Sequence, residues 1–170
     1  MSLSDEKTRK KVLTAQQRLL DNARTVHIAV HYEEEGEVYI DQGQAPFIRH
    51  QGALYIYSSH LSGHIRGLLS GGHAQFLLIE DESKSQNIWA RVRMKFSAEI
   101  TELGRDDDFF NTACDLIGEA HGPVMDMIRN FTDFHLFRII PVDGVLVTGF
   151  AAAYKVQGAD FTLTEHLRQS

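Results

Sequence analysis

The chain reads IWARVRMKF from Ile88 to Phe96, with an apolar side chain at every second position. Because successive side chains of a strand point to opposite faces, this alternation predicts a strand, which we extend to Ile88–Ile100. The expected apolar face carries Ile88, Ala90, Val92, Met94 and Phe96, and the expected basic face carries Trp89, Arg91, Arg93 and Lys95. The apolar face belongs in a core, so the stretch indicates a half-buried sheet.

The expected basic face combines three cations with an indole ring. Cations bind carboxylates and phosphates, and a planar aromatic side chain stacks on a planar ligand. The candidate ligand-binding residues of this strand are therefore Trp89, Arg91, Arg93 and Lys95. A solvated outer face with extended side chains explains the same pattern equally well, and periodicity leaves both interpretations open.

Shorter segments on both sides of this stretch repeat the strand pattern. We expect further strands at 26–32, 38–40, 54–57, 76–79, 134–140 and 145–156, and helices at 4–23, 61–69, 106–120 and 123–130. An acidic turn at Glu33–Glu37 and a turn at Asp143-Gly144 separate neighbouring strands. Such short connections favour antiparallel pairing, and closing the sheet removes its exposed edges. The predicted fold class is mainly β (α+β), a barrel of about six to seven antiparallel strands with flanking helices.

Length and composition bound the class of protein. With 170 residues, 43% of them apolar and 24% charged, we expect one globular domain over 1–170. Within it we expect an N-terminal helix at about 4–23 and a C-terminal tail at about 158–170. The net charge of -6 argues against a general nucleic-acid binder. No apolar run would span a bilayer and the N-terminus is polar, so we expect a cytoplasmic protein without a membrane partner.

The histidines and the single cysteine limit the metal chemistry. Cys114 alone allows no intramolecular disulfide and no cysteine-rich zinc site, and its helical pattern favours a small buried residue. His60 and His64 lie four residues apart near the expected helix at 61–69 and could hold a metal ion. No third ligand accompanies them at a fixed spacing, so two ordinary surface histidines are the favoured interpretation. The sequence also has no GxSxG, GxGxxG or GxxxxGK(S/T) motif to support a hydrolase or a nucleotide-binding fold.

Six short stretches follow one another at characteristic spacings. They are Ala45–Phe47, Ser59–Arg66, Leu78–Glu82, Ala90–Arg93, Asp133–Arg138 and Gly149–Tyr154. From about Gln17 onward, their order and spacing resemble the HugZ/HutZ-type heme-utilisation proteins. These proteins are a group within the pyridoxamine 5'-phosphate oxidase-like, FMN-binding split barrels. The ordered set carries the resemblance, and no single stretch decides it.

The resemblance implies a split barrel that works as a homodimer, with two ligand sites at the subunit interface. Relatives bind heme there, and some of them degrade it with oxygen and electrons to release iron. Other split-barrel families hold FMN in the corresponding groove. Either ligand is a planar ring with anionic ends, which the expected basic face could accommodate.

The resemblance also implies roles for single residues. Asp133 matches the acid that supports the iron-ligating histidine, Arg91 and Arg93 match a basic strand, and His64 matches a histidine near the heme. Relatives ligate iron with a histidine a few residues beyond the one that matches His166, and no second histidine follows here. Either His166 takes the place of that ligand, or this chain binds heme differently, weakly or not at all.

The surroundings of His166 in the sequence are polar, so a solvated histidine in a tail is the default interpretation. As an axial ligand of heme iron, it would need an acceptor for its other ring nitrogen. Asp133 is the candidate acceptor, within the chain or across a dimer, although an aspartate there is also typical of a turn. We therefore predict heme binding, with oxidative heme degradation as its activity. An FMN-binding oxidoreductase and a non-catalytic heme carrier are the alternatives.

Overall fold

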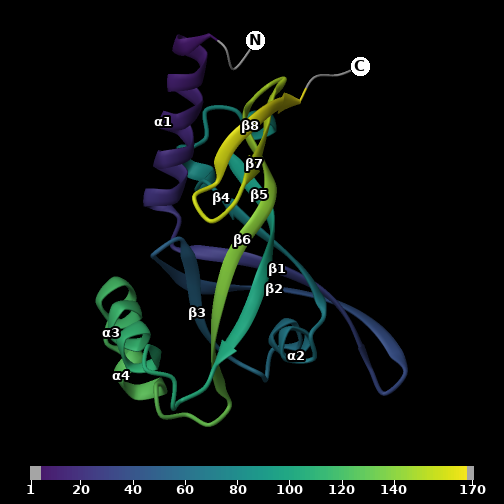
Figure 1. Cartoon of the computed structure of the whole chain (residues 1–170), viewed down its shortest axis with the longest axis vertical. Coiled ribbons are helices and arrows are strands. Elements are labelled where there is room, and N and C mark those ends of the chain that lie inside the picture. The colour runs from purple at the N-terminus through teal and green to yellow at the C-terminus, as the bar shows by residue number, and fades with distance from the viewer. Residues whose placement is uncertain (1–4, 168–170) are drawn as a thin grey trace. The chain divides into compact units, whose positions relative to one another are not determined.

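The computed structural model describes residues 5–167, which form four α-helices and eight strands (Figure 1). The helices are α1 (Glu6–Asn22), α2 (Gly63–Leu69), α3 (Phe110–His121) and α4 (Val124–Ile128). The strands are β1 (Thr25–Glu34), β2 (Glu37–His50), β3 (Ala53–Ser59), β4 (His73–Ile79), β5 (Arg93–Leu103), β6 (Phe134–Gly149), β7 (Ala152–Gln157) and β8 (Thr162–Leu167). Within the described residues, no helix is both long and apolar enough to cross a bilayer.

The eight strands form one sheet in the order β3-β2-β1-β4-β5-β6-β7-β8, with an additional pairing between β3 and β6. This pairing is antiparallel, runs from Leu54 opposite Ile139 to Ser59 opposite Phe134, and closes β1 to β6 into a ring of pairings. Closure leaves these strands without a free edge there. The antiparallel barrel with flanking helices is confirmed. The sheet has one strand more than expected, because Thr162–Leu167, inside the expected tail, pairs with β7.

The chain divides into two compact units, which we describe separately. The first unit takes the N-terminal residues to Ala23, then Leu77–Ser97 and the residues from Pro141; the second takes Arg24–Phe76 and Ala98–Ile140. Strands β4, β5 and β6 contribute residues to both units. The extent of a single domain over 1–170 stays a prediction.

In the first unit, α1 supplies an apolar face to the core. Asp5 caps the helix by accepting a hydrogen bond from the backbone N–H of Thr8 at 3.0 Å. Ser4, where we expected the helix to begin, lies outside the described residues. Val12 and Leu19 are buried, and Gln16 between them donates to the backbone oxygen of Phe161 at 2.7 Å. This contact satisfies a buried amide while it fastens the helix to the segment before β8.

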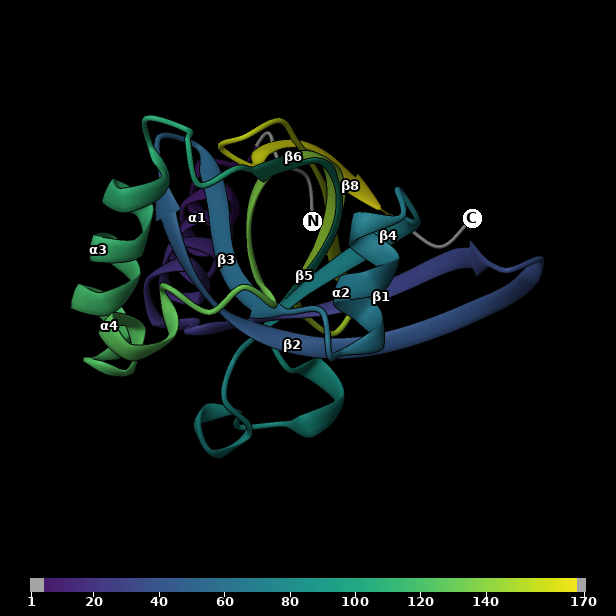
Figure 2. The same ribbon diagram turned by 90° about the horizontal axis from the view of Figure 1, so that it is seen from below.

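In the second unit, α3 and α4 lie side by side (Figure 2) and share a hydrophobic cluster with β3. The cluster includes Tyr55, Tyr57, Phe110, Cys114, Ile117, Met125 and Leu136. Cys114 is fully buried in it, as expected, and this burial raises the pKa of its thiol. The cysteine therefore acts as a small apolar residue.

Three sequence-based expectations about strand limits are wrong. The strand expected at 145–156 is divided between β6 and β7 by a turn at Phe150-Ala151. The strand predicted at Ile88–Ile100 begins only at Arg93, because Ile88–Ala90 forms a 3-10 turn, η2. The Asn87 side-chain oxygen accepts a hydrogen bond from the backbone N–H of Trp89 at 3.0 Å. The Asn87 backbone oxygen accepts one from the backbone N–H of Ala90, also at 3.0 Å. This local hydrogen bonding competes with an extended backbone. Apolar and polar residues therefore alternate from Ile88 onward, although the strand begins only at Arg93.

The turn predicted at Asp143-Gly144 does not exist, and β6 runs through both residues to Gly149. Gly144 is needed there for a close approach between strands. A Cβ atom on it would lie 2.3 Å from the backbone oxygen of Lys95 and 2.8 Å from Cβ of Phe96. The glycine therefore marks tight packing of β6 against β5 rather than a reversal of the chain.

We expect Gly144→Ala to lower the free energy of unfolding by about 1–3 kcal/mol, because the neighbouring backbone must move to admit the methyl group. Urea denaturation of the full chain measures this. Gly118→Ala on α3 is the matched control, since its new Cβ would meet only the Met125 side chain, at 3.5 Å. The control should keep or gain stability, because alanine favours a helix over glycine. Equal stability of the two variants would contradict this explanation of Gly144.

Candidate ligand-binding site

A cavity of about 660 Å³ in the first unit gathers three of the residues predicted from the sequence. Trp89, Arg93 and His166 all line it, together with Phe150, Ala151 and Leu167. They come from η2, from the start of β5, from the turn between β6 and β7, and from β8. Its volume lies in the range of small-molecule pockets in proteins. Because three residues predicted from the sequence also line it, we take it as the candidate site.

Two aromatic side chains of this cavity are unusually exposed. Trp89 is 80% exposed and Phe150 is 69% exposed. The η2 turn places Trp89 outside the strand ladder, and Ala151, with φ of 50°, shapes the turn that presents Phe150. Exposed flat rings around a hollow are typical of surfaces that bind a planar ligand or a partner protein.

His166 is held in place by β8 and is not a solvated tail residue. Its ring stacks on Tyr154 at 4.8 Å between centroids, and its Nε2 lies 3.0 Å from the backbone oxygen of Ala151. Because a carbonyl oxygen only accepts hydrogen bonds, Nε2 is the donor in this contact. Nδ1 is buried and has no hydrogen-bond partner within residues 5–167. Burial raises the pKa of the Tyr154 phenol, so the ring beneath His166 stays neutral.

The four residues of the expected basic face separate in the structure. Arg93 lines the cavity, and its guanidinium donates to the backbone oxygen of Arg91 at 3.0 Å. Arg91 donates to the backbone oxygen of Glu80 at 2.7 Å and forms an ion pair with Glu82 at 3.6 Å. Lys95 is exposed on β5 and does not line the cavity. Only Trp89 and Arg93 of the four therefore meet there.

Asp133 and His64 belong to the second unit. The Asp133 carboxylate accepts from the hydroxyl of Ser59 at 2.5 Å, and its backbone oxygen accepts from the N–H of His60 at 2.9 Å. Within the described residues, the partner of the Asp133 carboxylate is thus a serine. Its pairing with His166 stays a prediction.

His64 lies on α2, is only 7% exposed, and packs against the backbone of β2. A Cβ atom on Gly43 would fall 2.1 Å from Cε1 of His64, so glycine is required for the ring to fit. Burial lowers the pKa of His64, and the Asp41 carboxylate opposes part of this shift. The imidazole is therefore favoured in its neutral form, and it is not the surface histidine that the sequence suggested.

A chain of three titratable groups was missed by sequence analysis. His60 precedes α2, and its Nδ1 lies 2.9 Å from Nε2 of His135. Nδ1 of His135 in turn lies 2.7 Å from a carboxylate oxygen of Glu102. The antiparallel register of β3 and β6 brings these histidines together. No local pattern could reveal a pairing between residues this far apart in the chain.

Comparisons with known proteins agree with the fold. No family model matches the sequence. The heme oxygenase HutZ of Vibrio cholerae serotype O1 is 33% identical over 125 residues, which are 74% of this chain and 71% of the relative. The crystal structure of Vibrio cholerae HutZ, called a heme storage protein, has a TM-score of 0.70 at 25% identity and covers 81% of this chain and 94% of its own.

A second solved structure, Campylobacter jejuni ChuZ, has a TM-score of 0.75 at 24% identity and covers 95% of this chain and 68% of its own. At this identity it supports the fold only. The match to HutZ, in contrast, extends over more than two thirds of both sequences. The chain therefore belongs to the HugZ/HutZ-type heme-utilisation family of split-barrel proteins.

Proposed function

We propose that this protein binds heme in the cavity lined by Trp89, Arg93, Phe150 and His166, and that it serves heme utilisation. The meeting of two exposed aromatic rings, a guanidinium and an imidazole around one hollow of about 660 Å³ carries the proposal. The family supports it, because the Vibrio cholerae relative is a heme oxygenase. Oxidative degradation of the bound heme is the proposed activity.

The side chains around the cavity suit each part of a heme. Trp89 and Phe150 offer flat apolar surfaces to a porphyrin face, whose burial would remove apolar area from water. Arg93 offers a guanidinium to a propionate carboxylate. Heme brings the redox-active iron, and the protein supplies binding, orientation and electrostatics.

His166 is the proposed iron ligand. Two features of its ring affect iron ligation. Nδ1 is buried and has no hydrogen-bond partner among the described residues, and Nε2 contacts the backbone oxygen of Ala151. Ligation through Nε2 requires that this nitrogen give up the Ala151 carbonyl and its proton. An acceptor at Nδ1 would then fix the ring and increase its basicity. We assign that acceptor role to Asp133 of a second copy in a homodimer, and we place the protein in the cytoplasm.

A hemin titration of the full chain should give a saturable Soret shift at one heme per subunit. We expect His166→Ala to weaken binding at least about tenfold and to move the Soret maximum, since an axial ligand stabilises the complex and sets its spectrum. His27→Ala, which removes an exposed histidine of β1, is the control and should match the parent. An unchanged affinity and Soret position in His166→Ala would remove His166 as the ligand. Saturable FMN binding with only non-specific hemin uptake would favour the flavin alternative.

Arg93→Gln should weaken hemin binding about tenfold and leave the Soret position unchanged, because it removes a charge-assisted hydrogen bond to a propionate and not an iron ligand. Hemin dimethyl ester, which lacks the carboxylates, should bind the parent and Arg93→Gln with similar affinity. Arg9→Gln, an exposed arginine on α1, is the control for a change in charge. If Arg93→Gln lowered the affinity for the ester as much as it lowers the affinity for hemin, that result would argue against the propionate contact.

An assay of heme degradation distinguishes a heme-degrading enzyme from a heme carrier. With ascorbate and oxygen, the heme complex of a degrading enzyme should lose its Soret band and release iron that ferrozine detects. A complex whose spectrum survives these conditions would support heme carriage and contradict the proposed degradation. The iron release is needed as a second measurement because free peroxide also bleaches heme.

A further inference from the structure

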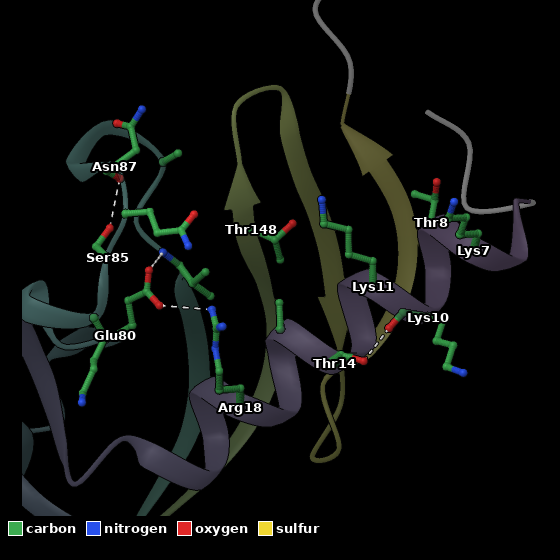
Figure 3. Close-up of a pocket in the computed structure, with 15 residues that line it drawn as sticks. Lys7, Thr8, Lys10, Lys11, Thr14, Arg18, Glu80, Ser85, Asn87 and Thr148 are labelled. Atoms are coloured by element: carbon green, nitrogen blue, oxygen red, sulfur yellow. Dashed lines mark hydrogen bonds and ion pairs between the residues drawn. The ribbon is translucent and has the colours of Figure 1, made fainter.

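A second and larger cavity of the first unit, about 900 Å³, runs beside α1 (Figure 3). Five cations line it, namely Lys7, Lys10, Lys11, Arg18 and Lys84. Its one carboxylate, Glu80, is already neutralised by Arg18 at 3.3 Å and accepts from the backbone N–H of Val92 at 2.9 Å. We call this basic cavity the α1 groove. It is strongly positive in a chain of net charge -6.

Three of the cations of the α1 groove form a stripe along the helix. Lys7, Lys11 and Arg18 are spaced by four and seven residues, so they share one face over about 16 Å. In Figure 3, Lys11 extends over the same side of the helix as Thr148. Among the described residues, Lys7, Lys11 and Lys84 form no ion pair. The stripe therefore has charge to offer to a partner.

The groove suits an extended acidic surface better than one small anion. Its free cations are exposed lysines, which are flexible point charges without a fixed geometry. The one guanidinium, that of Arg18, is engaged by Glu80. Complementary patterns of charge on two proteins make use of such a surface through steering and register.

An acidic surface of the required kind lies on the β1–β2 hairpin of the second unit. Its tip carries Glu33, Glu34, Glu35 and Glu37, all exposed and without an ion pair among the described residues. Glu34 lies directly opposite Glu37 across the two strands. Like charges at such positions destabilise a hairpin, so a cationic partner would relieve a real repulsion.

The hairpin also exposes apolar side chains next to this tip. Val38 is 63% exposed and Ile40 is 82% exposed on β2. Apolar residues beside a charged rim are typical of a protein interface. The hairpin thus has the composition of a docking element, and its charge is complementary to that of the α1 groove.

We propose that the acidic tip Glu33–Glu37 of one copy docks in the α1 groove of a second copy. This contact rests on the homodimer included in the proposed function, and it assigns to that dimer a specific electrostatic contact. In a two-fold symmetric dimer the contact forms twice, which doubles its effect. Because the groups are exposed, the contact weakens as salt rises.

A charge swap in the full chain tests the contact. We expect Glu34→Lys with Glu35→Lys, and separately Lys7→Glu with Lys11→Glu, to weaken dimerisation about tenfold or more in sedimentation equilibrium at low salt. The combined variant replaces all four tip glutamates (Glu33, Glu34, Glu35 and Glu37) with lysine and Lys7, Lys10, Lys11 and Lys84 with glutamate. It reverses the charge of both surfaces and should return the dissociation constant to within about threefold of the parent. Arg9→Glu on α1 and Glu119→Lys on α3 are exposed controls outside both surfaces and should behave as the parent.

Three outcomes would overturn the contact. They are a monomeric parent, pairs of substitutions without effect, and a combined variant that stays as weak as its components. If the combined variant regained only the thermal stability of a monomer and did not dimerise, a second copy would be excluded as the occupant of the α1 groove. Hemin titration of the same variants is read separately, so loss of heme binding in the parent would contradict the proposed function and leave the dimerisation result intact.

Discussion

The antiparallel pairing of β3 with β6 is the constraint on which the barrel depends. It joins Leu54–Ser59 to Phe134–Ile139 and closes six strands into a ring of hydrogen bonds. Bringing together segments about 80 residues apart costs chain entropy, which the buried side chains of both strands offset. The same register sets Ser59 beside Asp133 and His60 beside His135, so the polar contacts of the second unit follow from backbone pairing.

In the first unit, local departures from regular strands create the site. The Asn87 side chain stabilises η2 and thereby turns Trp89 out of the strand ladder. The turn after Gly149 presents Phe150, and the register of β7 with β8 sets His166 on Tyr154. A strand that continued through Ile88 would have paired these backbone groups with a neighbour. The cavity therefore depends on the backbone pairing of β5 beginning at Arg93 and not at Ile88.

Three of the predicted site residues, Trp89, Arg93 and His166, line one cavity, and their role in binding stays a prediction. The sequence-based expectations that were wrong have physical causes. Alternation placed Arg93 correctly on β5, but it cannot tell a strand from a 3-10 turn in which a side chain competes for the backbone N–H. Gly144 looked like a turn because glycine is common in turns, whereas here it permits contact with Lys95 in the next strand. His64 looked like a surface residue because nothing local shows that Gly43 leaves room for its ring.

The sequence by itself determined the class of the fold and the family. Period-two alternation, short connections and the ordered stretches from Ala45 to Tyr154 are local properties that can be read along the chain. Only the tertiary structure decided which residues meet. Cavities, the orientation of His166 and the contacts of Asp133 depend on strand register, and register is set by pairings between distant segments. A shift of one residue in the register of a strand would turn every side chain of that strand to the opposite face of the sheet. The local sequence pattern alone therefore cannot specify which residues form the site.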